Sequence, residues 1–249
     1  MKKILFITIG MFFVALTAKA QFTTYGKIEY ERKVNIHRQL DEMADDAQNA
    51  TWIERFKSKA PKFSTSYFDM YFNTNKVMYK PGRESENQFK MFGGGPAAEN
   101  VVLTDLDAHK VSANKQVYDQ KFHIDDSMRV LKWKILDEVR TIANYKCRKA
   151  VSIICDSVYV VAFYTEDITV SGGPEMFSGL PGMILELAVP RLYTTWVATK
   201  VELIPPKDSD FEMEEKGKEM NQGEMVGKLQ ESLKQWGKMA SRNIWWCAL

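Results

Sequence analysis

Alternating apolar and polar residues run along most of this chain. Ile28, Tyr30 and Val34 alternate with charged residues, the period-two pattern of a strand with one buried face. The same pattern predicts a hairpin over 62–80 and strands over 101–106, 115–124, 129–140, 144–154, 157–165, 182–190 and 191–204. Because connections this short suit antiparallel neighbours, we predict a mainly β (α+β) fold, an antiparallel meander curled into a barrel or half-barrel.

Two stretches replace the alternation with apolar residues spaced three or four apart, as in amphipathic helices. Residues 38–59 predict a helix inserted after the first strand. Residues 209–244 predict a C-terminal helical segment that opens on a Ser209-x-x-Glu212 capping box. Its apolar stripe, expected to pack on the sheet, is formed by Met225, Leu229, Leu233, Trp236 and Ala240. Residues 81–100 lack either periodicity and predict a surface loop.

The first twenty residues have the three-part order of a signal peptide. Lys2 and Lys3 precede a mostly apolar run over 4–16, and Ala18 and Ala20 form a small-residue cleavage site. The run is shorter than the about 20 apolar residues of a spanning helix. We therefore expect a signal peptide over 1–20 and a single domain over 21–249 with its core over 100–204. We expect no transmembrane segment after cleavage, and a periplasmic or secreted protein.

Removal of this segment changes the charge of the chain. Without Lys2, Lys3 and Lys19, 31 basic side chains remain against 32 acidic ones, so the net charge is about −1. No basic surface is left to predict nucleic acid as a partner. Three cysteines are an odd number for an exported chain. Cys147 and Cys155 flank a predicted hairpin, so they are candidates for a disulfide or for a reactive thiol.

Recognisable catalytic and metal-binding patterns do not occur in the sequence. It contains no G-x-S-x-G, H-E-x-x-H, Walker or G-x-G-x-x-G motif. His37, His109 and His123 lack ligand spacing, although His109 and His123 could meet across strands. The acidic cluster Asp41, Glu42, Asp45 and Asp46 is typical of a solvated helix face. The sequence therefore predicts no metal site and no cofactor, and it favours a non-catalytic protein over an enzyme.

An unusual segment, SGGPEMFSGLPGMILEL over 171–187, crowds glycines and prolines before a predicted strand. Its GLPGMILEL part resembles the signature of the GLPGLI family of exported bacterial proteins. Upstream blocks resemble that family in order and spacing: LKWKI with Trp133, NYKCRKA over 144–150, FYT over 163–165 and ITVSGGP from Ile168. The chain departs from the family pattern at Asn144, Phe163, Thr169 and Met183. The family is uncharacterised, so the resemblance implies relatives and export but no catalytic residues.

The motif itself allows a structural and a functional interpretation. In the structural one, residues 179–182 form a tight turn that launches a buried strand with Leu180 facing inward. In the functional one, the loop contacts a ligand through Gly173, Pro174, Gly179, Leu180, Pro181 and Gly182.

Three functions are open from the sequence. The first is a cell-envelope binding protein that holds an apolar small ligand, or part of an envelope partner, in the curved sheet. The second is an accessory or assembly factor for an outer-membrane protein, with Trp236, Trp245 and Trp246 as contact residues. The third is an enzyme with a site near Cys147 and the 171–182 loop.

Overall fold

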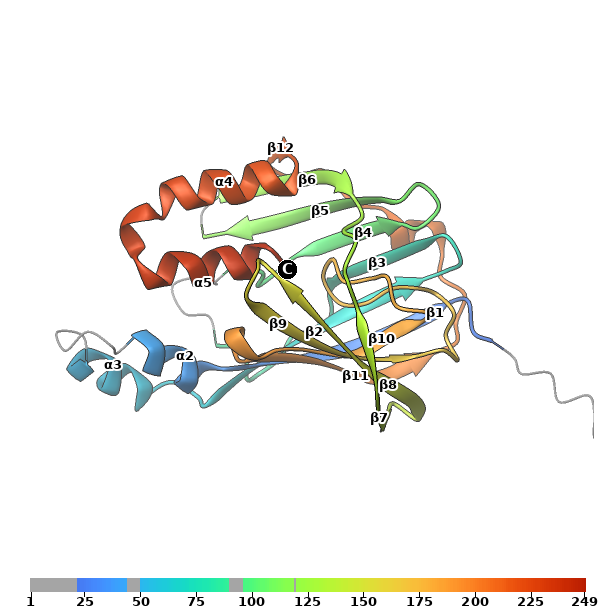
Figure 1. The fold of residues 1–249 in the computed structure, drawn as a ribbon, viewed down its shortest axis with the longest axis horizontal. Coiled ribbons are helices and arrows are strands. Elements are labelled where there is room, and N and C mark those ends of the chain that lie inside the picture. The colour runs from blue at the N-terminus through green and yellow to red at the C-terminus, as the bar shows by residue number, and fades with distance from the viewer. Residues whose placement is uncertain (1–21, 44–49, 90–95, 119) are drawn as a thin grey trace, which may run out of the picture.

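The computed structural model describes residues 22–43, 50–89, 96–118 and 120–249. They form one twelve-stranded sheet that curls without closing, a half-barrel (Figure 1). The predicted mainly β fold with a curled antiparallel meander is confirmed. The strands are β1 (Gly26–Asn35), β2 (Phe63–Phe72), β3 (Lys76–Pro81), β4 (Val101–Asp105), β5 (Lys110–Val117), β6 (Gln120–Ser127), β7 (Lys134–Ile142), β8 (Tyr145–Ile154), β9 (Val158–Thr165), β10 (Met183–Val189), β11 (Thr194–Glu202) and β12 (Lys218–Met220).

Two sequential meanders make up the sheet, whose order is β12-β6-β5-β4-β3-β2-β1-β11-β10-β9-β8-β7. They join where β1 pairs with β11, and among the described strands only β12 pairs parallel, with β6. Since β6 and β7 lie near opposite ends of this order, their connection, residues 128–133, crosses from one edge region of the half-barrel to the other (Figure 1). We call residues 128–133 the strap.

Two of the predicted strands are wrong. The predicted strand over 115–124 is two strands, because the chain turns after Val117 with Tyr118 at a positive φ of 56°. The predicted strand over 129–140 begins only at Lys134. Leu131 and Trp133 do alternate with lysines, but they lie in the strap and pack against the hydrophobic core without a neighbouring strand. The other predicted strands coincide with observed ones to within a few residues.

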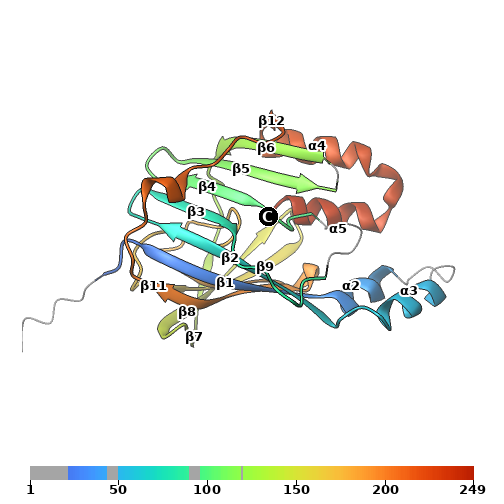
Figure 2. The ribbon, with the colours of Figure 1, turned by 180° about the vertical axis from the view of Figure 1, so that it is seen from behind.

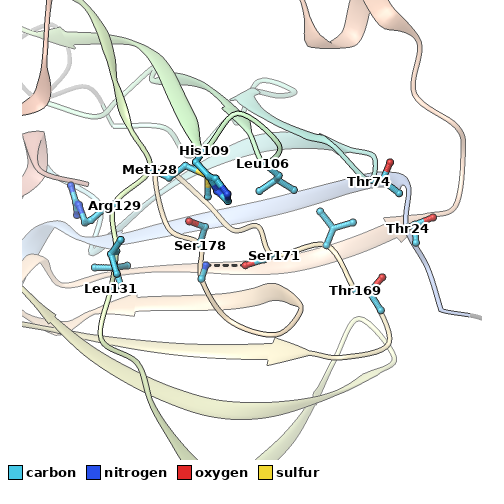
Figure 3. Close-up of a pocket in the computed structure, with 13 residues that line it drawn as sticks. Thr24, Thr74, Leu106, His109, Met128, Arg129, Leu131, Thr169, Ser171 and Ser178 are labelled. Carbon is cyan, nitrogen blue, oxygen red and sulfur yellow. Dashed lines mark hydrogen bonds between the residues drawn. The ribbon is translucent and has the colours of Figure 1, made fainter.

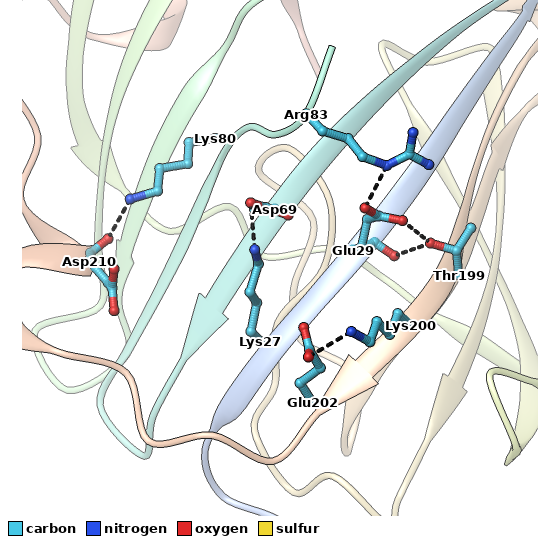
Figure 4. Close-up of polar contacts among 9 residues, drawn as sticks. All are labelled: Lys27, Glu29, Asp69, Lys80, Arg83, Thr199, Lys200, Glu202 and Asp210. Atoms are coloured by element: carbon cyan, nitrogen blue, oxygen red, sulfur yellow. Dashed lines mark hydrogen bonds and ion pairs between the residues drawn. The ribbon is translucent and has the colours of Figure 1, made fainter. Parts of the chain in front are cut away.

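Buried and more exposed residues alternate along the strands and so lie on opposite faces of the sheet. On β1 the residues Ile28, Tyr30 and Arg32 are buried on the concave side, whereas Lys27 and Glu29 lie on the convex side. There, Lys27 pairs with Asp69 at 2.8 Å, and Glu29 accepts bonds from Arg83 and Thr199 (Figure 4). Such half-exposed pairs contribute little stability, so the fold depends on the apolar concave side.

The predicted helix over 38–59 is observed in part. It comprises α2 (Ile36–Met43) and α3 (Ala50–Lys57), which project from one end of the half-barrel, while 44–49 lie outside the described residues (Figure 1). Ile36, Leu40 and Ile53 anchor this projection in the core. The predicted surface loop over 81–100 is not exposed along its whole length, because Ala97 and Asn100 near its C-terminal end are buried.

The Ser209 capping box starts no α-helix. Residues Asp208–Phe211 form a single 3-10 turn, whereas α4 (Gln222–Ser232) begins at an Asn221/Glu224 capping box. A second helix, α5 (Lys238–Cys247), follows and runs alongside α4 at the mouth of the half-barrel (Figure 2). Of the predicted stripe, Met225, Leu229 and Leu233 are buried in the core, but Trp236 is 46% exposed.

Candidate functional site

The Gly/Pro-rich segment folds into the concave side of the sheet. Residues 171–182 form the second part of the connection from β9 to β10 and reach across to β3, so that a Cβ on Gly172 would lie 3.0 Å from Val77. A Cβ on Gly173 would lie 2.8 Å from the Ile184 side chain. The two glycines therefore let the backbone pack where side chains would not fit. We call residues 171–182 the motif loop.

The end of the motif loop forms the tight turn that the sequence predicts. The Gly182 amide donates to the Leu180 carbonyl at 2.8 Å, Leu180 is buried, and β10 begins at Met183. Gly182 has a φ of +148°, and a Cβ there would lie 2.0 Å from the Thr165 carbonyl oxygen. Only glycine fits at this crossing of β9 and the turn.

A cleft of about 660 Å³ lies between the motif loop, the strap and the β4–β5 turn (Figure 3). Its size falls in the usual range for small-ligand sites, roughly 300–1,000 Å³. It is lined by Thr24, Thr74, Leu106, His109, Met128, Arg129, Val130, Leu131, Thr169, Val170, Ser171, Ser178 and Gly179. Apolar side chains and hydroxyls thus share its surface.

Two hydrogen bonds fix the motif-loop wall of the cleft. The indole of Trp133, in the strap, donates to the Ser178 carbonyl at 2.9 Å. The Gly179 amide donates to the Ser171 hydroxyl at 2.9 Å (Figure 3). Trp133 and the motif loop, which belong to separate sequence blocks, therefore act as one structural unit.

The predicted binding residues of the motif loop are only partly brought to this cleft. Gly179 lines it, whereas Gly173, Pro174, Leu180 and Gly182 are buried and Pro181 is exposed without lining it. The remaining lining residues come from separate stretches of the chain and carry no shared spacing. The one sequence signal for part of this wall is the ITVSGGP run over 168–174, which contains two of the hydroxyl side chains.

A second group of polar side chains is buried inside the half-barrel. Glu175 of the motif loop is 2% exposed and has a φ of +56°, unusual for a residue with a side chain. Its carboxylate accepts bonds from Tyr79 at 3.4 Å and from the Asn100 side-chain amide at 2.8 Å. The Asn100 side-chain oxygen has no hydrogen-bond partner among the described residues. Trp196 donates to the Tyr79 hydroxyl at 3.0 Å.

Cations from two strands face this group. Arg32 donates to Ser66 at 3.1 Å and to the Ala97 carbonyl, and it lies over the Phe68 ring. Burial raises the pKa of the Glu175 carboxyl, although Arg32 and Lys115 partly oppose this rise. Burial likewise lowers the pKa of Lys115 to about 8, and the charge of Glu175 opposes that change.

All three cysteines are free thiols. Cys147 is buried, and burial raises its pKa to about 12, which disfavours the nucleophilic thiolate. Cys155 is exposed in the β8–β9 turn and is not bonded to Cys147. Cys247, at the end of α5, is buried with its pKa raised by burial to about 12.

Of the other candidate residues, His109 lines the cleft, whereas the remainder of those that the structure describes do not lie around it. His123 is buried on β6 against the Asn114 side chain, whereas His109 is exposed in the β4–β5 turn. Asp41 pairs with Lys57, and Glu42 with Arg242; Asp45 and Asp46 lie outside the described residues.

The described ranges hold neither a metal-ligand cluster nor a membrane-spanning helix. Among these residues no group of three or more histidines, cysteines and carboxylates could hold a metal ion. In the same ranges no helix is long and apolar enough to cross a membrane. Of the C-terminal tryptophans, Trp246 is buried and Trp245 half-buried, so Trp236 alone among them offers a largely exposed ring.

Comparison with known proteins gives a family match over a short region. Residues 151–186 match a family described as "Protein of unknown function (Porph_ging)". This span contains the whole motif loop and the GLPGMILE sequence. No curated protein matches the chain.

Solved structures of PNGF-II share the fold at low sequence identity. Two structures of PNGF-II, in different space groups, are 16% identical with TM-scores of 0.52 and 0.51. They cover 80% and 90% of this chain, but the chain spans only about a third of theirs (32% and 33%). An uncharacterized conserved protein from Thermus thermophilus is 5% identical with a TM-score of 0.37, over 85% of this chain and 98% of its own. The PNGF-II similarity extends to the fold alone.

Proposed function

We propose that this is an exported cell-envelope protein of the GLPGLI family that binds a small, largely apolar ligand without chemically changing it. The cleft between the motif loop and the strap is the observation that carries the proposal. Its lining includes the apolar side chains of Leu106, Met128, Leu131 and Val170. Burying an apolar ligand against such side chains contributes roughly 25 cal/mol per Å² of surface removed from water.

Hydroxyl groups give the cleft its selectivity. Thr24, Thr74, Thr169 and Ser171 lie among the lining residues and come from three different segments. A few polar groups on a mainly apolar wall are the usual means of orienting a small ligand. The proposed ligand therefore has an apolar body and one or more hydrogen-bonding groups.

Three further observations support the export, family and non-catalytic parts of the proposal. The N-terminal sequence has the order of a signal peptide. The family match over 151–186 covers the GLPG sequence. The main nucleophile candidate, Cys147, is buried with a raised pKa.

Binding of N-phenylnaphthylamine, an apolar dye whose fluorescence rises in apolar sites, tests the cleft directly. Thr169 is exposed and lines the cleft, so Thr169→Trp fills it without disturbing the core. We expect this variant to bind the dye at least about tenfold more weakly, a loss of about 1.4 kcal/mol. Thr141→Trp, at an exposed site on β7 outside the cleft, is the matched control and should bind like the wild type.

Equal dye binding by the wild type and Thr169→Trp would contradict the proposal. Native mass spectrometry of the protein isolated from the envelope fraction then identifies what it carries. A bound small molecule supports the proposal, whereas a stoichiometric envelope protein and no small molecule would favour the partner-binding function.

A further inference from the structure

Residues 243–249 occupy the mouth of the half-barrel and are held there by a buried lysine and a half-buried arginine. Lys115, on the concave side of β5 and 2% exposed, donates to the Cys247 carbonyl at 2.9 Å. Arg129, in the strap, donates to the Ala248 carbonyl at 2.5 Å. Gln222 also donates to the Cys247 carbonyl, at 2.9 Å. We call residues 243–249 the closing segment.

Aromatic contacts and burial also hold the closing segment in place. The Trp246 ring lies 6.4 Å from that of Trp196 and 6.0 Å from the Arg32 guanidinium. Trp246, Cys247, Ala248 and Leu249 are all buried. A short peptide with an apolar side-chain face and two charge-assisted carbonyl contacts is bound in the manner of a ligand.

The charges beneath this segment are not balanced within the described interior. Arg32 and Lys115 are buried cations and Arg129 is a half-buried one, whereas Glu175 is the one buried carboxylate among the described side chains. Asp126 acts on Arg129 from the half-exposed edge of β6. The acceptors that Arg32 and Lys115 contact are neutral: a hydroxyl, carbonyls and an amide. Buried cations are costly unless an anion or a full set of hydrogen bonds compensates them.

We propose that the concave surface beneath the closing segment binds a single-chain amphiphile with a carboxylate or phosphate head group, and that the closing segment occupies this surface until such a ligand displaces it. The head group replaces the Cys247 and Ala248 carbonyls at Lys115 and Arg129, and the alkyl chain replaces Trp246 against Trp196. This rests on the proposed function and names its ligand class.

Arg129 connects this surface to the cleft. It lines the cleft and also holds the Ala248 carbonyl, so a head group that reaches Arg129 from the cleft competes directly with the closing segment. The cleft is then the access route, and the concave surface is the final site. Because the closing segment competes with the ligand, the apparent affinity for the ligand equals the intrinsic affinity multiplied by the fraction of molecules in which the segment is displaced.

The Cys247 thiol reports displacement without any change to the site. It is buried in the closed form, and Cys155→Ser removes the exposed thiol that would otherwise react first. We expect a dansyl-labelled undecanoic acid to raise the rate of Cys247 alkylation by iodoacetamide about tenfold or more. Inorganic phosphate alone, and the methyl ester of the same dansyl acid, should leave the rate unchanged, because each lacks either the chain or the charge.

Two substitutions are expected to change the affinity for the dansyl acid in opposite directions. Trp246→Ala loosens the closing segment and should tighten binding several-fold. Lys115→Met removes the cation and should weaken binding about tenfold or more. Lys121→Met, at an exposed position on the neighbouring β6, is the control and should bind like the wild type. Because Lys115 also holds the Cys247 carbonyl, Lys115→Met should expose Cys247 without ligand. Loosening of the closing segment alone would tighten binding, as in Trp246→Ala, so weaker binding of the dansyl acid reports the loss of the cation.

The outcomes separate this inference from the proposed function. Dansyl-acid binding that leaves Cys247 protected, or that Trp246→Ala and Lys115→Met do not alter, overturns the inference and leaves the cleft as the binding site. The inference is also overturned if the protein binds N-phenylnaphthylamine in the cleft but does not bind the dansyl acid. Failure of both probes overturns both proposals.

Discussion

At the residue scale, Gly182 has much less space around its Cα than Gly179, the other glycine of the GLPG turn. A Cβ there would lie 2.0 Å from the Thr165 carbonyl oxygen, at a φ that side chains rarely adopt. We expect Gly182→Ala to lower the free energy of unfolding by at least about 2 kcal/mol, since clash and backbone strain add. Urea unfolding followed by tryptophan fluorescence measures the change.

Gly227→Ala is the matched control for that prediction. Gly227 lies in α4 with open space around it, and glycine weakens a helix interior. Alanine should therefore stabilise the protein by about 0.5–1 kcal/mol. If Gly182→Ala unfolds at the same urea concentration as the wild type, the close approach of β9 and the turn is incorrect.

The buried Glu175 carboxyl predicts how the free energy of unfolding changes with pH. Because burial raises its carboxyl pKa in the folded protein, the unfolded chain loses this proton first as the pH rises. The contribution of Glu175 to stability is therefore largest below the ordinary carboxyl pKa and is lost as the pH rises through the raised value. The groups that set this balance are Arg32, Tyr79, Asn100 and Lys115.

Glu175→Gln removes the titration, so its stability relative to the wild type should increase as the pH rises from the ordinary carboxyl pKa through the raised value. Glu138→Gln should change in the opposite sense and in a lower pH range, because bonds from Lys149 and Arg140 lower the pKa of the Glu138 carboxyl. The contribution of Glu138 is present above the ordinary carboxyl pKa and is lost as the pH falls through the lowered value. Urea midpoints at a series of pH values compare the three proteins. Parallel curves for Glu175→Gln and the wild type would contradict the buried, raised carboxyl.

The sequence did not predict this cluster of buried polar side chains around Glu175. Glu175 stands in a Gly/Pro-rich stretch that is typical of exposed loops, and Asn100 follows a segment without periodicity. Lys115 even broke the apolar alternation of β5, which displaced the predicted strand. Polar residues that face inward are recognised only when the strands that surround them are known.

At the element scale, α4 shows how local chemistry selects one helix start over another. The Asn221 side chain accepts from the Glu224 amide at 2.8 Å, and Glu224 accepts from the Asn221 amide at 3.0 Å. Asn221→Ala should therefore cost about 1 kcal/mol of stability. Ser209→Ala, at the capping-box sequence that starts no α-helix, should change stability by less than about 0.5 kcal/mol. Equal effects in thermal unfolding would contradict this assignment.

The strands themselves were largely predictable, because one concave face is buried along nearly the whole sheet. Residues such as Ile28 and Tyr30 then alternate strictly with more exposed ones. The pattern failed where burial has another cause, as for Leu131 and Trp133 in the strap, which pack on the core from outside the sheet. Periodicity detects a buried face but not the element that covers it.

At the scale of the whole molecule, the three thiols report its integrity. Cys155 is exposed, whereas Cys147 and Cys247 are buried on different elements with their pKa values raised to about 12. We expect iodoacetamide to modify one thiol per native molecule quickly and the other two only on unfolding. Mass spectrometry of tryptic peptides after timed quenching measures this. Rapid native modification of Cys147 would contradict its burial and restore it as a nucleophile candidate.

The pairing of β1 with β11 determines the order in which the sheet can be completed. The strands β1 to β6 pair with their sequence neighbours, except for the insertion of α2 and α3, so this half can assemble from local contacts. The other edge of β1 must wait for a partner far along the chain, since Glu29 bonds with Thr199 across that seam, 170 residues later. We therefore expect a long, unpaired edge to persist at the centre of the future sheet during biosynthesis, and closure of this seam to be the slow, aggregation-exposed step of folding.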